Sequence, residues 1–497
     1  MTITSQQELT TRATSEDEGF SSLLKKSFRP ATDEKQKAIE QAVGTLAEWA
    51  VRNSKLLSDD TVESIKALIA SIDEMLSNQL NEILHHPDFQ KLEGAWRGLH
   101  YLVSNTETDE MLKIRVMPIS KAELRTTLKK FKGSAWDTSP LFKKIYEEEY
   151  GVLGGEPYGC LVGDFYFDHS PADAETLGEM AKIAAAAHAP FISAASPVLM
   201  GMDSWQELSN PRDLTGIFGT PEYAAWNSLR KSEDSRYIGL TLPRFLARRP
   251  YGARSEPVEE FDFEEDTAQG SSSAFCWTNS AYAMATNINR AFKLYGWCTR
   301  IRGVESGGAV EGLPTYTFPT DDGGVDMACP TEIAISDRRE AELAKNGFMP
   351  LVHRKNSDFA AFIGAQSMQK PTKYDDPDAS ANAELAARLP YLFASCRFAH
   401  YLKAMVRDKV GGTFNNPDEV QKWLQGWITK NYVHGNPAMA SELEKARKPL
   451  AAAEVVVQEM EDNPGYYNAQ FFLKPHYQLE GLTIALKLVS RLKSEKQ

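Results

Sequence analysis

The chain has 497 residues, of which 42% are hydrophobic and 25% are charged, a balance that is ordinary for soluble globular proteins and large enough for two or three domains. Its net charge of −13 argues against general nucleic-acid binding, which needs a basic surface to displace counterions. No stretch is apolar enough to insert in a membrane, and the first ten residues lack a signal segment, so we expect a cytoplasmic protein. Five scattered cysteines without a C-x-x-C pair agree with a reducing compartment.

The first 34 residues form a polar arm with one apolar island. Four side chains of the island recur at i, i+3, i+4 and i+8, which places them on one face of a short helix: Phe20, Leu23, Leu24 and Phe28. A helix this short is marginal by itself, so we expect it to fold against another surface. That surface could be its own domain or a groove on a partner, and the spacing alone favours neither.

A helical region is predicted over residues 35–105. Apolar residues at helical spacing indicate one helix over 35–53 and a second over 60–85, which begins with Asp60 and Glu63 in the register of a capping box. In the second helix the stripe expected to be buried consists of Val62, Ile65, Ile69, Ile72, Leu76, Leu80 and Ile83.

A third helix begins near Pro87 and contains the stretch F-Q-K-L-E-G-A-W-R-G-L-H-Y-L-V, residues 89–103. Arg97 is expected to be exposed beside a buried face that consists of Leu92, Ala95, Trp96, Leu99, Leu102 and Val103. Gly94 and Gly98 occupy a neighbouring stripe, where the missing side chains allow another backbone to approach closely. A helix this short, flanked by charges, does not indicate a membrane dimer.

Strands and helices alternate over residues 106–370, which predicts an α/β domain and a mixed α/β fold class for the chain. The run M-L-K-I-R-V-M-P at 111–118 alternates like a strand, and a helix with a capping box at Ser120 follows it. A buried strand at 159–168, a helix at 171–188 and a returning strand indicate a β-α-β unit with a right-handed crossover.

A polar, proline-containing linker at 371–382 precedes a C-terminal domain, 383–497. This domain is predicted to contain helices near 383–409 and 417–431, followed by three strand-like runs. The last run places its alternate apolar residues on one face: Leu482, Ile484, Leu486 and Leu488. A long strand near a terminus is unusual unless its edges find a partner, so we expect it to join another sheet.

No catalytic motif is evident in the sequence. The chain lacks a phosphate loop, a dinucleotide fingerprint, a zinc-protease helix and a nucleophile elbow, so no catalytic residue, cofactor or metal is predicted. Asp164, Asp168 and His169 lie at the end of a predicted strand, where α/β enzymes place catalytic groups. They are the best lead for an enzyme, although no nucleophile or cofactor loop accompanies them.

Three other clusters have a structural interpretation that we prefer. His85, His86 and Asp88 could bind a metal, but histidines at the end of a helix more commonly cap its negative pole. The acidic run at 320–326 lacks the twelve-residue loop of a calcium site and is interpreted as a turn. The basic stretch R-F-L-A-R-R at 244–249 could face an acidic partner, but a solvated turn is the simpler interpretation.

The stretch L-E-G-A-W-R-G-L-H-Y-L-V at 92–103 resembles the signature of the large sheath subunit of the bacterial type VI secretion system, the TssC/VipB (EvpB) family. Three further stretches share the resemblance: T-E-I-A-I-S-D-R-R-E-A-E-L at 331–343, F-I-G-A-Q-S at 362–367 and the long block at 464–492. The resemblance runs from about residue 20 to the end, and the final block is long enough to be specific.

The resemblance implies a structural protein and not an enzyme. The chain would pair with a smaller sheath subunit (TssB/VipA), and these pairs would polymerise with other copies into a helical sheath around a tube of Hcp hexamers. Contraction of the sheath would drive the tube out of the cell. The sheath would be cytoplasmic and anchored through baseplate components to the envelope complex. The AAA+ ATPase ClpV would disassemble it after contraction.

The resemblance also implies roles for particular residues. The apolar face of the arm would be recognised by ClpV, and the terminal strand would be exchanged with neighbouring protomers. One charged helix supplies candidates for a contact with the tube or with a neighbouring subunit: Arg338, Arg339, Glu342 and Lys345. The alternative for these four residues is a solvated helix face.

Two other functions stay open on the residues alone. One is an α/β enzyme that uses Asp164, Asp168 and His169. The other is a capsid- or adaptor-type shell protein that assembles without contracting.

Overall fold

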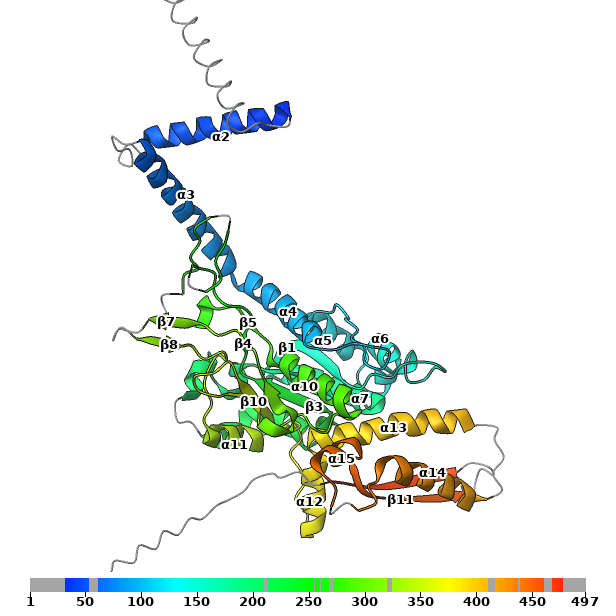
Figure 1. The fold of residues 1–497 in the computed structure, drawn as a ribbon. Coiled ribbons are helices and arrows are strands. Elements are labelled where there is room, and N and C mark those ends of the chain that lie inside the picture. Colours follow the sequence, from blue (N-terminus) through cyan, green and yellow to red (C-terminus); the bar gives the residue numbers. More distant parts are fainter. Residues whose placement is uncertain are drawn as a thin grey trace, which may run out of the picture. The chain divides into compact units, whose positions relative to one another are not determined.

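The computed structural model describes residues 32–52, 61–209, 213–253, 255–259, 261–267, 272–319, 324–409, 416–436, 439–459 and 467–476 (Figure 1). The chain divides into two compact units. The first unit comprises the chain up to His85 together with Pro250–Asp266, and the second comprises His86–Arg249 together with the chain from Thr267 onward. Two predicted features lie outside the described residues: the apolar face of the arm (Phe20, Leu23, Leu24, Phe28) and the terminal strand (Leu482, Ile484, Leu486, Leu488).

In its described residues the first unit has the helices α2 (Asp33–Arg52) and α3 (Thr61–Leu84), which confirm the helices predicted at 35–53 and 60–85. The predicted burial of the α3 stripe is wrong for four residues that are between 44% and 52% exposed: Ile65, Ile69, Leu76 and Ile83. Periodicity shows that a helix face is apolar but does not show what covers it. The described part of this unit contains no sheet that could cover α3.

The second unit is built around a six-stranded sheet. In spatial order its strands are β1 (Leu161–Phe167), β2 (Phe191–Ala195), β3 (Ile238–Leu242), β9 (Phe348–His353), β10 (Ala360–Phe362) and β6 (Ala309–Val310). The first four strands are parallel, whereas β10 runs antiparallel to both of its neighbours. The predicted β-α-β unit is confirmed as β1, α7 (Pro171–Ala187) and β2.

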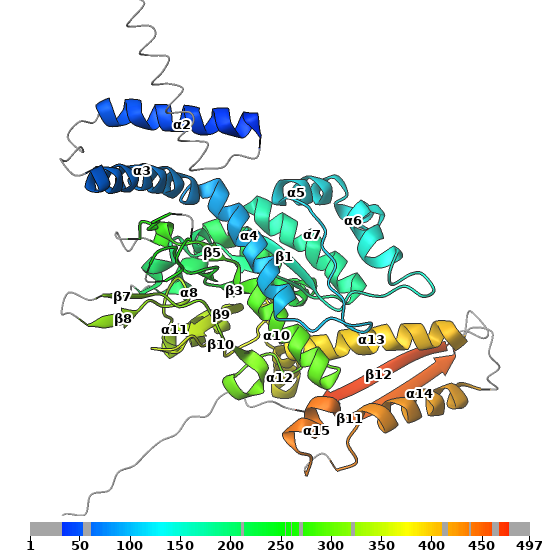
Figure 2. The same cartoon turned by 45° about the horizontal axis from the view of Figure 1, so that its top comes forward.

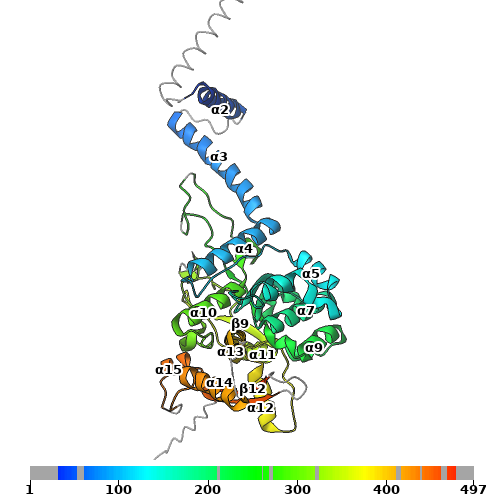
Figure 3. The same cartoon turned by 90° about the vertical axis from the view of Figure 1, so that its right-hand side faces the viewer.

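Helices cover both faces of this sheet (Figure 3), because alternate strand residues point to opposite sides. On one face Phe191 and Leu240 pack with α7, whose buried small residues, such as Ala181, bring the helix close. On the other face Ile192 packs with α10 (Ser280–Tyr295). The result is a three-layer α/β arrangement, which confirms the predicted mixed fold class.

Shorter elements complete this layer structure. The remaining helices before residue 350 are α4 (Pro87–Ser104), α5 (Lys121–Lys130), α6 (Pro140–Phe142), α8 (Leu214–Phe218), α9 (Ala224–Lys231) and α11 (Asp337–Lys345). Two small sheets pair β4 (Phe245–Leu246) with β5 (Trp277–Thr278) and β7 (Thr317–Pro319) with β8 (Val325–Met327). The capping box predicted at Ser120 is present at the start of α5.

The strand predicted at 111–118 is not formed. Residues 112–120 belong to no helix or strand, and they pair with no strand of the described residues. Alternation of apolar and polar side chains is not enough to form a strand, because a strand also needs a neighbour whose backbone groups it can pair with.

The described residues between 377 and 476 form helices followed by a hairpin (Figure 2). Its elements are α12 (Pro377–Ala386), α13 (Leu389–Lys409), α14 (Pro417–Tyr432), α15 (Glu442–Arg447), β11 (Leu450–Glu459) and β12 (Tyr467–Pro475). The two strands are antiparallel, and α14 packs on β11. Since α12 begins inside the segment 371–382, the role of that segment as a domain boundary stays a prediction.

Candidate interaction surfaces

One face of α4 makes a close contact with β5. Gly94 and Gly98 are buried, and a Cβ atom on either would lie less than 3.0 Å from atoms of Trp277, Thr278 or Tyr282. The Thr278 hydroxyl donates a hydrogen bond to the carbonyl oxygen of Gly94 (2.8 Å). The close approach predicted for the two glycines is therefore confirmed.

The neighbouring face of α4 differs from the sequence prediction. Leu92 and Trp96 are 57% and 66% exposed, and Val103 is also exposed. Of the stripe predicted to be buried, Leu102 lies in the core and Leu99 is half-buried. The glycine stripe takes the contact with the protein body, which turns the tryptophan stripe away from it.

The charged neighbours of this contact form an internal cluster. One carboxylate oxygen of Glu93 accepts from Arg248 Nε and from Arg97 Nε, both at 2.7 Å. Burial alone would raise the pKa of Glu93, but the hydrogen bonds and charges of the two guanidinium groups outweigh it, so the pKa is lowered. The predicted exposure of Arg97 is thus wrong, because its side chain lies half-buried beside Glu93.

The basic stretch 244–249 is not a solvated turn throughout. Arg244 forms a bidentate pair with the buried carboxylate of Glu332, with both N–O distances 2.8 Å. Arg248 is buried with Glu93, and Arg249 is exposed. Two of the three arginines in this stretch therefore stabilise the fold. The local sequence could not show this, because their partners Glu332 and Glu93 lie far away in the chain.

The four charged residues predicted on α11 lie in two different environments. Arg339 Nη1 pairs with a Glu342 carboxylate oxygen at 2.7 Å, and the other oxygen of Glu342 accepts from the backbone N of Leu214 (2.9 Å) at the start of α8. Arg338 and Lys345 are exposed, and the structure gives them no ion-pair partner within its described ranges. A contact with a tube or a neighbour stays a prediction, and the geometry favours Arg338 and Lys345 for it.

Each of the three residues of the enzyme lead is engaged by another group of the fold. Against the effect of burial, hydrogen bonds from Ser170 lower the pKa of Asp168, and the charge of His169 also helps to lower it. Asp164 hydrogen-bonds with Asn279 and Tyr282, and burial raises its pKa against the effect of these bonds. Asp168 accepts from the backbone N of Ser170 (2.8 Å) in the turn that starts α7. The ring of His169 stacks on Tyr223, with 4.4 Å between the centroids.

The histidines before α4 have roles different from the predicted cap of a negative helix end. His86 is the N-cap of α4, where its Nδ1 accepts from the backbone N of Asp88 (3.3 Å). His85 Nε2 lies 3.5 Å from the carboxylate of Glu265. The proline at the first position of α4 explains the difference, because it starts a new helix directly after His86.

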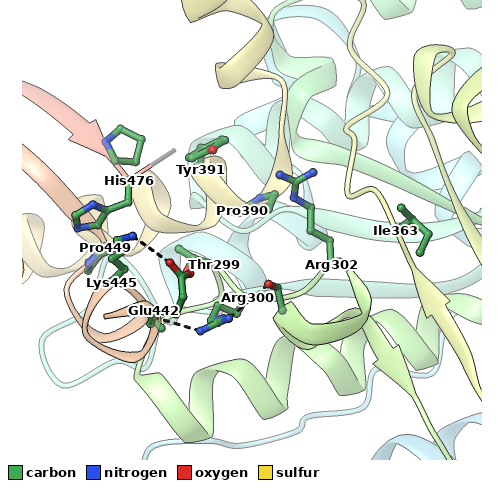
Figure 4. A pocket seen from close by; sticks show the side chains of 14 residues that line it. Thr299, Arg300, Arg302, Ile363, Pro390, Tyr391, Glu442, Lys445, Pro449 and His476 are labelled. Carbon is green, nitrogen blue, oxygen red and sulfur yellow. Dashed lines mark hydrogen bonds and ion pairs between the residues drawn. The ribbon is translucent and has the colours of Figure 1, made fainter. Parts of the chain in front are cut away.

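A basic pocket of about 410 Å³ lies where β12 ends (Figure 4). Its charged and aromatic lining residues are Arg300, Arg302, Tyr391, Glu442, Lys445 and His476. Lys445 Nζ pairs with the Glu442 carboxylate (3.0 Å), and Arg300 Nη1 donates to the Glu442 carbonyl oxygen (3.2 Å). Burial and the charge of Lys445 lower the pKa of His476. Because three lysine and arginine side chains and only one carboxylate line it, the pocket suits an anionic group.

The two edges of the C-terminal hairpin differ. Two glutamines of α14 bind the outer edge of β11: Gln425 accepts from Val455 N (2.8 Å) and donates to Ala453 O (2.8 Å), and Gln421 accepts from Val457 N (3.1 Å). The outer edge of β12 has no neighbouring strand among the described residues. Our sequence interpretation missed these glutamines, although their spacing of four on one helix face was an available signal.

No helix in the described part of the chain is long and apolar enough to cross a membrane. Two family models match the chain: EvpB/VC_A0108, tail sheath N-terminal domain, over residues 66–369, and EvpB/VC_A0108, tail sheath gpW/gp25-like domain, over residues 378–492. A relative from Pseudomonas aeruginosa PAO1, the type VI secretion system sheath protein TssC1, is 71% identical over 492 residues. The alignment covers 99% of this chain and 98% of that relative.

Solved structures of injection machines share part of the arrangement at low sequence identity. The baseplate of the anti-feeding prophage matches with a TM-score of 0.37 and 12% identity, over 77% of this chain and 84% of that one. The contracted sheath complex of the extracellular contractile injection system PVC matches with a TM-score of 0.29 and 10% identity, over 60% and 63%.

Proposed function

Because the chain belongs to the EvpB/VC_A0108 family of tail sheath proteins, we propose that it is a structural subunit of a contractile type VI secretion sheath. The observation that carries this proposal is the 71% identity to a sheath protein across nearly the whole of both chains. The alternative of an α/β enzyme is not favoured, since each of its three residues is engaged by another group of the fold: Asp164 by Asn279 and Tyr282, Asp168 by Ser170, and His169 by Tyr223. The function is then mechanical, with neither a cofactor nor a metal.

The proposed assembly contains two kinds of sheath subunit. This chain pairs with a small subunit (TssB/VipA), and the pairs polymerise in the cytoplasm around a tube of Hcp, from baseplate components at the envelope. Co-expression of this chain with its small partner, followed by negative-stain microscopy, tests the assembly. We expect tubules with cogwheel-shaped cross-sections, whereas monodisperse soluble protein would contradict the proposal.

Contraction would draw on energy stored in the packing of the extended polymer. Two arrangements of the same rigid subunits, one better buried than the other, suffice for a switch that fires once, and no nucleotide is needed for firing. The contact with the tube must then be polar and weak, because contraction has to release it. The exposed cations Arg338 and Lys345 suit such a contact.

Exchange of the terminal strand would hold the subunits together while they rotate. Residues 478–492 of one chain would add to the outer edge of β12 in a neighbour, since the outer edge of β11 is occupied by Gln421 and Gln425. Removing 478–497 should abolish sheath formation. Ile484→Lys should have the same effect, whereas Thr483→Lys on the opposite strand face is the matched control. Unchanged polymerisation of the truncated chain would contradict the exchange.

The N-terminal arm would be the handle for disassembly by ClpV. Deleting residues 1–29 should leave tubules intact and abolish their ATPase-driven disassembly. Leu24→Asp on the apolar face should reproduce the loss, and Ser22→Asp on the opposite face should not. Failure of the truncated chain to form tubules would contradict the assignment of the arm as the site that ClpV recognises.

A further inference from the structure

The basic pocket at the end of β12 lies beside the last residue that the structure describes. His476 lines the pocket, and residues 477–497 continue the chain from that position. The other cations of the lining are Arg300 and Arg302, which precede β6, and Lys445 of α15. Figure 4 shows these side chains around one cavity. The residues that follow His476 therefore start within reach of three cations.

The positive charge of the pocket is only partly compensated by the described residues. Lys445 pairs with the Glu442 carboxylate (3.0 Å), but the Glu442 side chain is 73% exposed, and such surface pairs are weak. Arg300 donates to two uncharged oxygens, the Glu442 carbonyl (3.2 Å) and the Ser306 hydroxyl (3.4 Å), and it forms no ion pair with a described residue. His476 Nε2 is buried and has no hydrogen-bond partner there either. The pocket thus has charge and polar atoms for one more carboxylate.

The terminal run supplies a carboxylate close to this pocket. Glu480 comes four residues after His476, a separation of at most about 14 Å along a fully extended chain. The next acidic residue is Glu495, which follows the whole apolar run and has Lys493 and Lys496 beside it. Glu480 is therefore the acidic side chain of this run that the pocket can reach first.

The position of Glu480 does not suit the strand that is expected to follow it. The alternate apolar residues of that strand begin at Leu482, and Glu480 falls on the same face, where a charge would interrupt the apolar surface. Gly481 separates the two, and glycine allows the backbone to change direction there. The sequence thus sets the carboxylate apart from the strand.

We propose that the pocket holds Glu480 of the same chain, with its carboxylate paired to Arg300, and that this pair anchors the base of the terminal run. The strand that reaches a neighbour would then begin after Gly481, from a fixed point on the body. Because a fixed start leaves fewer residues to be ordered, less conformational entropy is lost when the strand pairs. The anchoring role rests on the proposed function, since it serves an exchanged strand, whereas the ion pair itself does not depend on that function.

A photo-crosslinker in place of Leu479 tests the occupant in the isolated full-length chain. We expect an intramolecular adduct with residues 299–306 or 442–449. Arg300→Gln should lower the yield of this adduct at least about threefold, the effect of losing one partly exposed ion pair. Arg447→Gln is the matched control, because Arg447 is exposed on α15 and does not line the pocket.

Two outcomes of the crosslinking would overturn the inference. One is the absence of an adduct with the pocket, or an equal yield in Arg300→Gln and the control. The other is an adduct that joins two chains, because the pocket would then hold the terminal run of a second copy.

An exchange of charges tests what the pair does in assembly. With the small partner co-expressed, Glu480→Arg and Arg300→Glu should each reduce the yield of tubules, and the double variant should restore it. Glu495→Arg, at the other carboxylate of the run, should form tubules normally. Normal tubules from both single variants, or no recovery in the double variant, would overturn the anchoring role. If a charge reversal lowers the thermal midpoint of the isolated chain, the crosslinking of Arg300→Gln decides instead.

The two experiments separate this inference from the sheath function. A wild-type chain that gives the intramolecular adduct but never forms tubules would count against the sheath function and leave the ion pair supported. Normal wild-type tubules without the adduct would overturn the ion pair and leave the sheath function intact.

Discussion

Gly98 packs so closely on Thr278 and Tyr282 that the fold has no room for a methyl group there. Gly98→Ala should lower the free energy of unfolding by about 1–3 kcal/mol, the usual cost of overpacking a core. Gly426→Ala is the matched control: this glycine is also helical, in α14, and a Cβ on it would meet nothing within 4 Å. It should raise stability by up to about 1 kcal/mol. Equal effects in urea unfolding would contradict the close contact.

His400 should make the protein sensitive to mild acid. It is buried with Nε2 3.0 Å from the Ala187 carbonyl oxygen, and burial, together with the charges of Arg397 and Lys403, lowers its pKa to about 4. The unfolded chain binds a proton near pH 6.5, so the stability held above that pH is lost as the pH falls toward 4. At 1.36 kcal/mol per pKa unit the loss amounts to about 3 kcal/mol.

Urea unfolding at pH 7.5 and pH 5 measures this effect. The drop in stability between the two values should be smaller in His400→Gln than in the wild type. His100→Gln, at an exposed residue of α4, should leave the drop unchanged. An equal drop in all three proteins would show that His400 does not carry the acid sensitivity.

At the scale of elements, one face of α11 packs against the protein body and the other face is exposed to solvent. The double variant Arg338→Glu, Lys345→Glu should retain the stability of the chain but weaken the retention of the tube inside sheaths, more strongly at low salt, because exposed ion pairs are screened. Arg339→Glu should instead destabilise the chain through Glu342 and α8. Co-purification of the tube with sheaths is the measurement, and full retention by the double variant would contradict the contact.

The sequence predicted where most elements lie and less well what surrounds them. The periodicity of apolar residues located α3, α4, β1 and α7. It does so because a helix or strand with one apolar face shows the same spacing of apolar residues whatever covers that face. Periodicity predicted the wrong buried face of α4. The stripe that contains Trp96 is more hydrophobic than the glycine stripe, but only the glycine stripe can approach another backbone closely. The segment 111–118 shows the complementary failure: its alternation is that of a strand, and the partner strand is absent from the described chain.

Candidate site residues were predictable only where the signal is local. The charged run of α11 and the alternation at 482–488 can be read directly from the sequence. The basic pocket near Arg300 and the cluster around Glu93 each combine segments far apart in the chain. Such sites depend on topology, which spacing within one segment does not encode.

At the scale of the whole molecule, several features favour assembly over independent action. Apolar side chains are exposed on α3, on α4 and along 111–118, and β1 and β12 each have an open edge within the described structure. Exposed apolar surface and unpaired strand edges are normally avoided in proteins that act alone. Together with family membership, they describe a chain whose fold is completed by its neighbours.

The most direct test is cryo-electron microscopy of sheaths assembled from this chain and its small partner. The account predicts a helical polymer with one copy of this chain in each repeating unit. Two states should occur, a long narrow one and a short wide one, with the fold of the second unit preserved in both. A polymer of fixed length and width, or tubules that lack this chain, would contradict a contractile sheath subunit.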